Sequence, residues 1–262
     1  MDIFLKCLKT MNKRFVCYTV LIGNYDKLSP IKFFPKDVDF VCLTDKKNVN
    51  VRGWKIQNIN SLNLYKKKFI NKHLSEIPKN DKLKNTHINR LIKFFPHKFF
   101  KEYEGSMYID GRVIIKKNPL GLIIKSLKKH TWSAPRHRKG GNSITESKRC
   151  FWSGKISLKE YLEYRVYVSK KNFLQIPLTE NGLLIRSHNK KIVISMADNW
   201  WSLYIKGPYR DQLHWQEAAD ITNLGFGLIK FSFNEKNPYL TLGQHIKKSN
   251  IVNYLARRLI VA

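Results

Sequence analysis

Acidic side chains are scarce in this sequence of 262 residues. Only 19 Asp and Glu stand against 49 Lys and Arg, which gives a formal net charge of +30. A charge of this size attracts polyanions, so the candidate partners are nucleic acid, anionic lipid, acidic glycan and phosphorylated substrates. The alternative is a Lys-, Asn- and Ile-rich proteome that places Lys at solvated positions, because net charge bears on association and not on fold.

Cysteine is also scarce, and its pattern excludes two kinds of site. The four cysteines, Cys7, Cys17, Cys42 and Cys150, contain no CxxC pair and no regular spacing. A disulfide framework and a zinc site are therefore not expected. Cys17 and Cys42 lie in apolar runs, where a free thiol behaves as a small hydrophobic group. A reducing compartment is the simpler interpretation.

Long hydrophobic runs are absent as well. No window approaches 18 apolar residues, and the start MDIFLKCLKTMNKRF lacks the pattern of a signal peptide. We therefore expect a cytoplasmic protein. The basic, amphipathic tail at 246–262 suits either peripheral contact with an anionic inner membrane face or docking on the protein's own core. Dinucleotide, Walker, HExxH, GxSxG, zinc-finger and RNP-type signatures are also missing.

What the sequence does contain is sufficient for a folded core. Hydrophobic residues make up 43% and aromatic residues 13%, with no internal repeat or linker, so we expect one domain over residues 1–262. Apolar, β-branched runs predict strands, and helical spacing predicts helices between them. This alternation indicates an α/β fold with a mostly parallel central sheet flanked by helices. The expected strands are 14–22, 38–43, 54–56, 106–109 and 182–186, and the main expected helices are 119–129, 157–168, 195–205 and 210–221.

Polar clusters follow three of these strands, at 23–26, 44–45 and 110–111. Ligands of open α/β sheets bind beyond the carboxyl ends of the strands. Asp110 is therefore placed to hold a divalent cation that bridges two phosphates, and Gly111 lets a ligand approach the backbone. The alternative is that Asp110 and Gly111 form the turn of a hairpin between 106–110 and 112–116.

A second cluster, Arg210, Asp211 and Gln212, opens an expected helix. Together these residues offer an anion clamp, a carboxylate and an amide, which suit the stabilisation of a sugar oxocarbenium ion. An Asp in the first turn is also expected from the helix dipole alone.

Two further clusters are candidates for a ligand site. His137 and Arg138 precede Glu146 across the loop RKGGNSITE, where a solvated basic loop is the competing interpretation. Arg186 and His188 follow the strand GLLIR. We treat these five residues as candidates for the binding of a ligand.

Seven segments, taken in order, resemble a known family over about residues 16–230. This is the plant and bacterial glycosyltransferase-like catalytic domain of turgor-regulation-defect and mucilage-related proteins. The segments are YTVLIGNYDKL, DFVCLTD, NRLIKFFPHKFF, YEGSMYIDGRVIIK, HRKGGNSITE, ENGLLIRSHN and WWSLYIKGPYRDQL. The resemblance implies a Rossmann-like A-type glycosyltransferase fold that binds a nucleotide diphosphate sugar, with a UDP-sugar favoured as donor.

The resemblance also implies roles for single residues. Arg90 and Lys93 would approach the diphosphate or the donor sugar. Asp110 would take the place of the metal-binding Asp of the DxD motif, with manganese or magnesium as the ion and His245 as a further ligand. The second acidic position of the motif is Arg112 here, whose cation can neutralise the diphosphate instead. The residues expected near the nucleoside are Thr19, Gly23, Tyr25, Asp26 and Asp45.

By the same likeness, Asp211 is the main catalytic carboxylate, Gln212 lies near the anomeric carbon and Arg210 positions Asp211 or a phosphate. The implied reaction moves a hexose, with retention or inversion, to a cell-surface polysaccharide or lipopolysaccharide acceptor. Two other functions remain open. One is a basic nucleic-acid-binding protein, and the other is a metal-dependent hydrolase that uses Asp110, His137 and His188.

Overall fold

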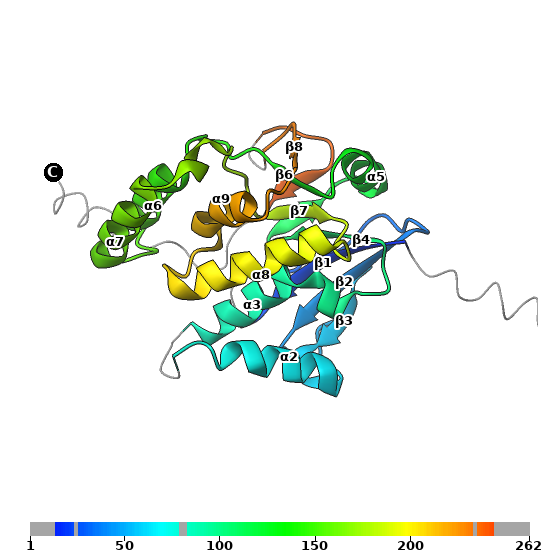
Figure 1. The fold of residues 1–262 in the computed structure, drawn as a ribbon. Helices are drawn as coiled ribbons and strands as arrows, with labels where there is room; N and C mark the ends of the chain where they lie inside the picture. Colours follow the sequence, from blue (N-terminus) through cyan, green and yellow to red (C-terminus); the bar gives the residue numbers. More distant parts are fainter. Residues whose placement is uncertain (1–13, 24–25, 79–82, 233–234, 244–262) are drawn as a thin grey trace, which may run out of the picture.

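The computed structural model describes residues 14–23, 26–78, 83–232 and 235–243, which form a seven-stranded sheet between layers of helices (Figure 1). The strand order is β3-β2-β1-β4-β7-β6-β8. The first four of these strands are parallel to one another. Their bounds are Phe15–Leu21 for β1, Val38–Thr44 for β2, Lys55–Asn58 for β3 and Gly105–Ile109 for β4.

One strand of the sheet is reversed. β7 (Leu183–Arg186) runs antiparallel to both β4 and β6 (Trp132–Pro135), and β8 (Gly227–Ile229) runs parallel to β6. The sheet is therefore mostly parallel, as predicted. The hairpin expected as an alternative around Asp110 is wrong, because β5 (Val113–Ile115) pairs with β9 (Leu240–Leu242) in a separate two-stranded sheet.

Helices cover both faces of the sheet (Figure 1). In β1, Val16, Tyr18 and Val20 pack into the core on the side of α3, α8 and α9, whereas Cys17 and Leu21 pack on the side of α5. Burial on both faces explains why β1 reads as a continuous apolar run. The helices on the first face are α2 (Leu64–Leu74), α3 (Lys84–Phe94), α4 (Pro96–Phe99), α8 (Lys191–Lys206) and α9 (Asp211–Ile221), and α5 spans Leu120–Lys129.

A smaller core lies between α6 (Ser143–Trp152), α7 (Leu158–Ser169) and the start of α9. At the start of α7, Ser157 and Glu160 form a reciprocal capping box. Two short 3-10 turns complete the described elements, η2 at Ile59–Ser61 and η3 at Asn172–Gln175.

The four main expected helices are confirmed as α5, α7, α8 and α9, with boundaries shifted by a few residues. Cys17, Cys42 and Cys150 are buried free thiols, in agreement with the sequence, whereas Cys7 lies outside the described residues. Within the described ranges, no helix combines the length and the apolar character needed to cross a bilayer.

Candidate functional site

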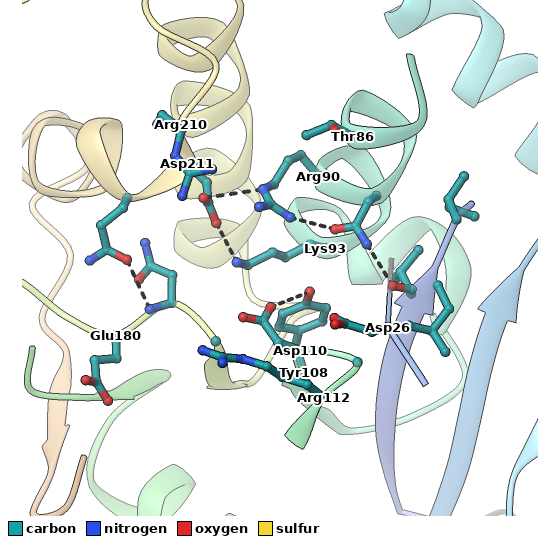
Figure 2. A pocket seen from close by; sticks show the side chains of 18 of the residues that line it. Asp26, Thr86, Arg90, Lys93, Tyr108, Asp110, Arg112, Glu180, Arg210 and Asp211 are labelled. Carbon is teal, nitrogen blue, oxygen red and sulfur yellow. Dashed lines mark hydrogen bonds and ion pairs between the residues drawn. The ribbon is translucent and has the colours of Figure 1, made fainter. Parts of the chain in front are cut away.

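A cavity of about 600 Å³ lies at the carboxyl ends of β1 and β4 (Figure 2). The loop before β7 closes one side of this cavity because β7 is antiparallel, which brings the start of β7 to the end of β4. Gly182 accepts a hydrogen bond from the backbone N–H of Asp110 at 2.9 Å. The polar side chains of the lining come from Asp26, Asn85, Thr86, Asn89, Arg90, Lys93, Tyr108, Asp110, Arg112, His137, Arg138, Glu146, Lys155, Glu180, Asn181, Arg210, Asp211 and Gln212.

Asp211 is the centre of a buried ionic network at the start of α9. Its Oδ2 lies 2.5 Å from Lys93 Nζ and its Oδ1 lies 3.3 Å from Arg90 Nε. Burial alone would raise the pKa of Asp211, but the charges of Arg90 and Lys93 outweigh it and hold the pKa well below its ordinary range. Asp211 is therefore a permanently ionised carboxylate and a weak base.

The two cations reach Asp211 because of their spacing on α3. Positions 86, 90 and 93 fall on one helical face, which is turned toward the cavity. Asn89 ties this helix to the sheet, since its amide donates to Val20 O at 2.7 Å and its Oδ1 accepts from Arg90 at 2.7 Å. Arg186 holds the backbone of Lys93, because its guanidinium donates a hydrogen bond to the Lys93 carbonyl oxygen at 2.9 Å.

Asp110 lies on the same cavity, directly after β4. Its Oδ1 accepts a hydrogen bond from Tyr108 Oη at 2.9 Å. Burial, reinforced by the charge of Asp110, raises the pKa of Tyr108 well above its ordinary value, so this hydroxyl stays a donor. Lys93 Nζ is 4.9 Å from the centre of the Tyr108 ring, and Figure 2 shows this side chain reaching between Asp211 and Asp110. The two aspartates that the sequence singled out thus share one pocket.

The turn after β1 comes close to Gly111. A Cβ on Gly111 would lie 2.2 Å from Leu21 Cδ2 and 3.2 Å from Asp26 Cβ, so this position accepts only glycine without a shift of its neighbours. Gly23 has a φ of +74° and its N–H donates to both oxygens of Asp45, at 3.0 and 3.1 Å. Asp45 therefore shapes the turn and does not line the cavity.

His137, Arg138 and Glu146, which the sequence singled out, also line the cavity. His137 Nε2 lies 3.7 Å from Glu146 Oε2, and the backbone N–H of Arg138 donates to Glu180 Oε1 at 3.3 Å. Burial lowers the pKa of His137, although Glu146 opposes this effect, so the ring is neutral at neutral pH.

Gln212 and Arg210 also line the cavity. The Gln212 side chain is held by two backbone groups, because its amide donates to Thr179 O and its Oε1 accepts from Asn181 N–H at 3.4 Å. The positive charge of Arg210 adds to that of Arg90 and Lys93 in lowering the pKa of Asp211. The three residues of the predicted catalytic cluster thus reach the pocket, with Asp211 already paired.

Besides Asp45, three residues assigned to the donor site lie outside the cavity lining. Arg186 is the last residue of β7 and His188 follows it. Because that strand is reversed, Arg186 is opposite Ser106 near the amino end of β4. Both are fully buried, and His188 Nε2 donates to Phe100 O at 2.8 Å. Thr19 is fully buried inside β1. His188 is therefore not at the pocket, where the hydrolase hypothesis requires it. Tyr25 and His245, which were also assigned to the site, lie outside the described residues.

The described residues of the pocket do not by themselves form a ligand set for a divalent metal. Among the described residues, no three Asp, Glu, His or Cys side chains come together as a ligand cluster. Asp110 is hydrogen-bonded to Tyr108, and the charges of Arg90 and Lys93 are close enough to interact with it. Cations thus surround the carboxylate that was predicted to be a metal ligand, and Arg112 supplies another beside it.

Several pocket residues were assigned no role from the sequence, notably Thr86, Asn89, Glu180 and Asn181. The first two were detectable, since they lie one turn apart on the same helix as Arg90 and Lys93. Glu180 and Asn181 were not, because their place depends on the direction of β7.

No protein-family model and no curated protein matches the sequence, so the resemblance to the turgor-regulation-defect and mucilage-related family stays a prediction. Among solved structures, the chain is similar to apo mouse xyloside xylosyltransferase 1, with 8% identity, a TM-score of 0.49 and coverage of 82% of this chain and 84% of that chain. It is similar to the galactosyltransferase LgtC with donor and acceptor sugar analogues, at 9% identity, a TM-score of 0.41 and coverage of 82% and 72%. It is also similar to the apo bifunctional glycosyltransferase WbbM, with 11% identity, a TM-score of 0.46 and coverage of 95% of this chain and 45% of that chain. At TM-scores below 0.5 the likeness is loose and bears on neither substrate nor reaction.

Proposed function

We propose that this chain is a glycosyltransferase that moves a hexose from a nucleotide diphosphate sugar to a glycan. One observation carries the proposal. Arg90 and Lys93, held by Asp211, face Asp110 across a cavity at the carboxyl ends of parallel strands. Fixed cations at this edge suit a diphosphate, and a cavity of about 600 Å³ is within the range that holds a ligand of this size.

In this reaction, the bond between the anomeric carbon and the diphosphate oxygen breaks, and the electron pair leaves with the diphosphate. Arg90, Lys93 and Arg112 are the residues we assign to the stabilisation of that charge. Preorganised cations in a water-poor site lower such a barrier, and the loss of one comparable contact costs roughly 3 kcal/mol.

The acceptor hydroxyl oxygen forms the new bond to the anomeric carbon. Asp211 is a poor base for the hydroxyl proton because both of its oxygens are paired. We assign this proton to the departing phosphate oxygen, which requires the acceptor to approach from the side of the leaving group and therefore retains the anomeric configuration. Asp211 is then a positioning residue that holds Arg90 and Lys93.

We propose a UDP-hexose as donor and a cell-surface polysaccharide, lipopolysaccharide or glycolipid as acceptor, reached from the cytoplasmic face of the membrane. The net charge of +30 supports contact with an anionic membrane or an acidic glycan.

A thermal-shift panel of nucleotide diphosphate sugars tests the donor. A ligand at about 100 times its Kd adds about 2.7 kcal/mol of stability. We expect a subset of the panel to raise the midpoint of the wild type but not that of Arg90→Gln, whereas Arg165→Gln, an exposed arginine on α7, serves as the matched control. If no nucleotide sugar shifts the wild type, or if Arg90→Gln responds equally, the proposed function is wrong.

A further inference from the structure

A second cavity, of about 780 Å³, adjoins the first. His137 and Arg138 line both, so the two cavities meet at this pair of residues. The rest of the second cavity is formed by the loop at 136–140 and by the segment at 228–232 that includes and follows the last residues of β8.

The charge of this second cavity is more one-sided than that of the first. Four cationic side chains line it, Arg136, Arg138, Lys139 and Lys230, against the single carboxylate of Glu235. That carboxylate already accepts a hydrogen bond from Ser232 N–H at 3.0 Å. By contrast, the four cationic groups make no hydrogen bond or ion pair with any other described residue. They are therefore available to an anionic ligand.

Arg149 holds the shape of the loop at 136–140, which presents three of these four cations. Its guanidinium donates to Gly140 O at 3.0 Å and to Lys139 O at 3.1 Å, and it also contacts Glu146 at 3.3 Å. Gly140 has a φ of +55°, which gives the loop its turn. Arg149 thus uses its charge within the protein, whereas Arg136, Arg138 and Lys139 are exposed. A preformed loop also reduces the entropy lost on binding.

The cavity also offers an apolar surface for a sugar. Phe231 lines it, and this ring is stacked against Tyr239 at 6.2 Å between centroids. A ring fixed in this way can pack on the face of a hexose while cations bind a charged substituent.

We propose that this second cavity, which we call the acceptor cavity, binds a glycan that carries a carboxylate or phosphate group. The shared residues His137 and Arg138 place this glycan beside the sugar donor. The proposal rests on the proposed function of the first cavity, from which it takes the role of acceptor.

Calorimetric titration with three probes tests the proposal. The probes are methyl glucuronoside, glucose 6-phosphate and neutral methyl glucoside. They are titrated into the wild type, into a triple variant of the acceptor cavity (Arg136→Gln, Lys139→Gln, Lys230→Gln) and into Arg90→Gln. A matched triple variant on α5 (Lys125→Gln, Lys128→Gln, Lys129→Gln) removes the same charge from exposed positions outside both cavities.

We expect the acceptor-cavity variant to bind at least one anionic sugar about tenfold more weakly, because it lacks three of the cations that line this cavity. The α5 variant and Arg90→Gln should bind that sugar as the wild type does, and methyl glucoside should bind more weakly than the anionic probes. Comparison of the glucuronoside with the phosphate identifies which anion is preferred.

Three results would overturn the acceptor cavity. They are equal weakening in the α5 variant, weakening in Arg90→Gln alone, and no binding of either anionic sugar by the wild type. Failure of the proposed function is read separately, because nucleotide sugars would then fail to bind while the anionic sugars still bind in the acceptor cavity.

Discussion

Asp211→Asn tests whether the buried carboxylate holds the two cations of the pocket. The substitution keeps the size of the side chain and removes its charge. Lys93, whose side chain is 2% exposed, and Arg90, whose side chain is 19% exposed, would then lack their counter-charge. Arg90 would stay charged, and Lys93 would either stay charged or lose its proton, in each case at a cost in free energy.

The expected loss is about 3–5 kcal/mol in the free energy of unfolding, since removal of one partner leaves an uncompensated buried charge. In a chain of this size, each kcal/mol shifts the midpoint by roughly 2–4 °C, so a fall of about 10 °C is expected. The double variant Lys93→Met with Asp211→Asn should be more stable than Asp211→Asn alone, because it removes one of the two stranded cations.

Denaturant unfolding measures these differences, with Glu104→Gln as the control. That residue pairs with Arg14 on the surface, where both side chains are more than half exposed, and its loss should leave the midpoint unchanged within error.

The lowered pKa of Asp211 also fixes the sign of the pH effect. Its contribution is present above the unfolded pKa near about 3.9, is lost as pH falls below it, and is missing in Asp211→Asn. If Asp211→Asn unfolds at the same denaturant concentration as the wild type, the carboxylate does not organise the site.

Three further predictions follow from single features of the fold. Gly111→Ala should lower both the affinity for nucleotide sugars and the unfolding midpoint, because its Cβ would lie 2.2 Å from Leu21 Cδ2. The control Gly121→Ala on α5 meets no atom within 4 Å and should raise the midpoint. Equal effects of the two substitutions in thermal unfolding would contradict this. The affinity for nucleotide sugars in calorimetry should be the same with EDTA as with manganese, because side-chain cations lie near Asp110. Loss of binding in EDTA would instead support a metal ion at Asp110. Burial lowers the pKa of His97, His188 and His214 to about 4 each. In the unfolded chain these histidines have a pKa of about 6.5, so below that pH the unfolded state binds more protons than the folded state, and stability falls by about 2 kcal/mol per histidine at about pH 5. A denaturation midpoint that stays level from neutral pH to about pH 5 would contradict this prediction.

Much of the fold was predictable because its signals are local. The buried runs of β1 and β2 and the helices α5, α7, α8 and α9 follow from composition and spacing over a few residues. The position of Asp110 after β4 was predictable for the same reason, since the rule for carboxyl ends needs only the end of the strand. Whether the whole chain is one domain stays a prediction.

The direction of a strand is not a local signal, and it caused the main errors at the site. The run GLLIR predicts a strand, but it does not say which neighbour pairs with it or in which sense. As an antiparallel neighbour of β4, β7 places Arg186 and His188 in the core and brings Glu180 and Asn181 to the pocket. The residues on the two ends of this strand thus exchange the places that a parallel strand would give them.

The role of Asp211 was also beyond the sequence, because it depends on a helix more than a hundred positions away. Along α9, an aspartate in the first turn has the same appearance whether it meets a substrate or two cations. Arg90 and Lys93 on α3 decide between these two possibilities, because they pair with both carboxylate oxygens of Asp211. With the Asp211 carboxylate neutralised by these pairs, the pocket presents cations to a ligand. Its chemistry is therefore better suited to stabilising a leaving diphosphate than to taking a proton from an acceptor.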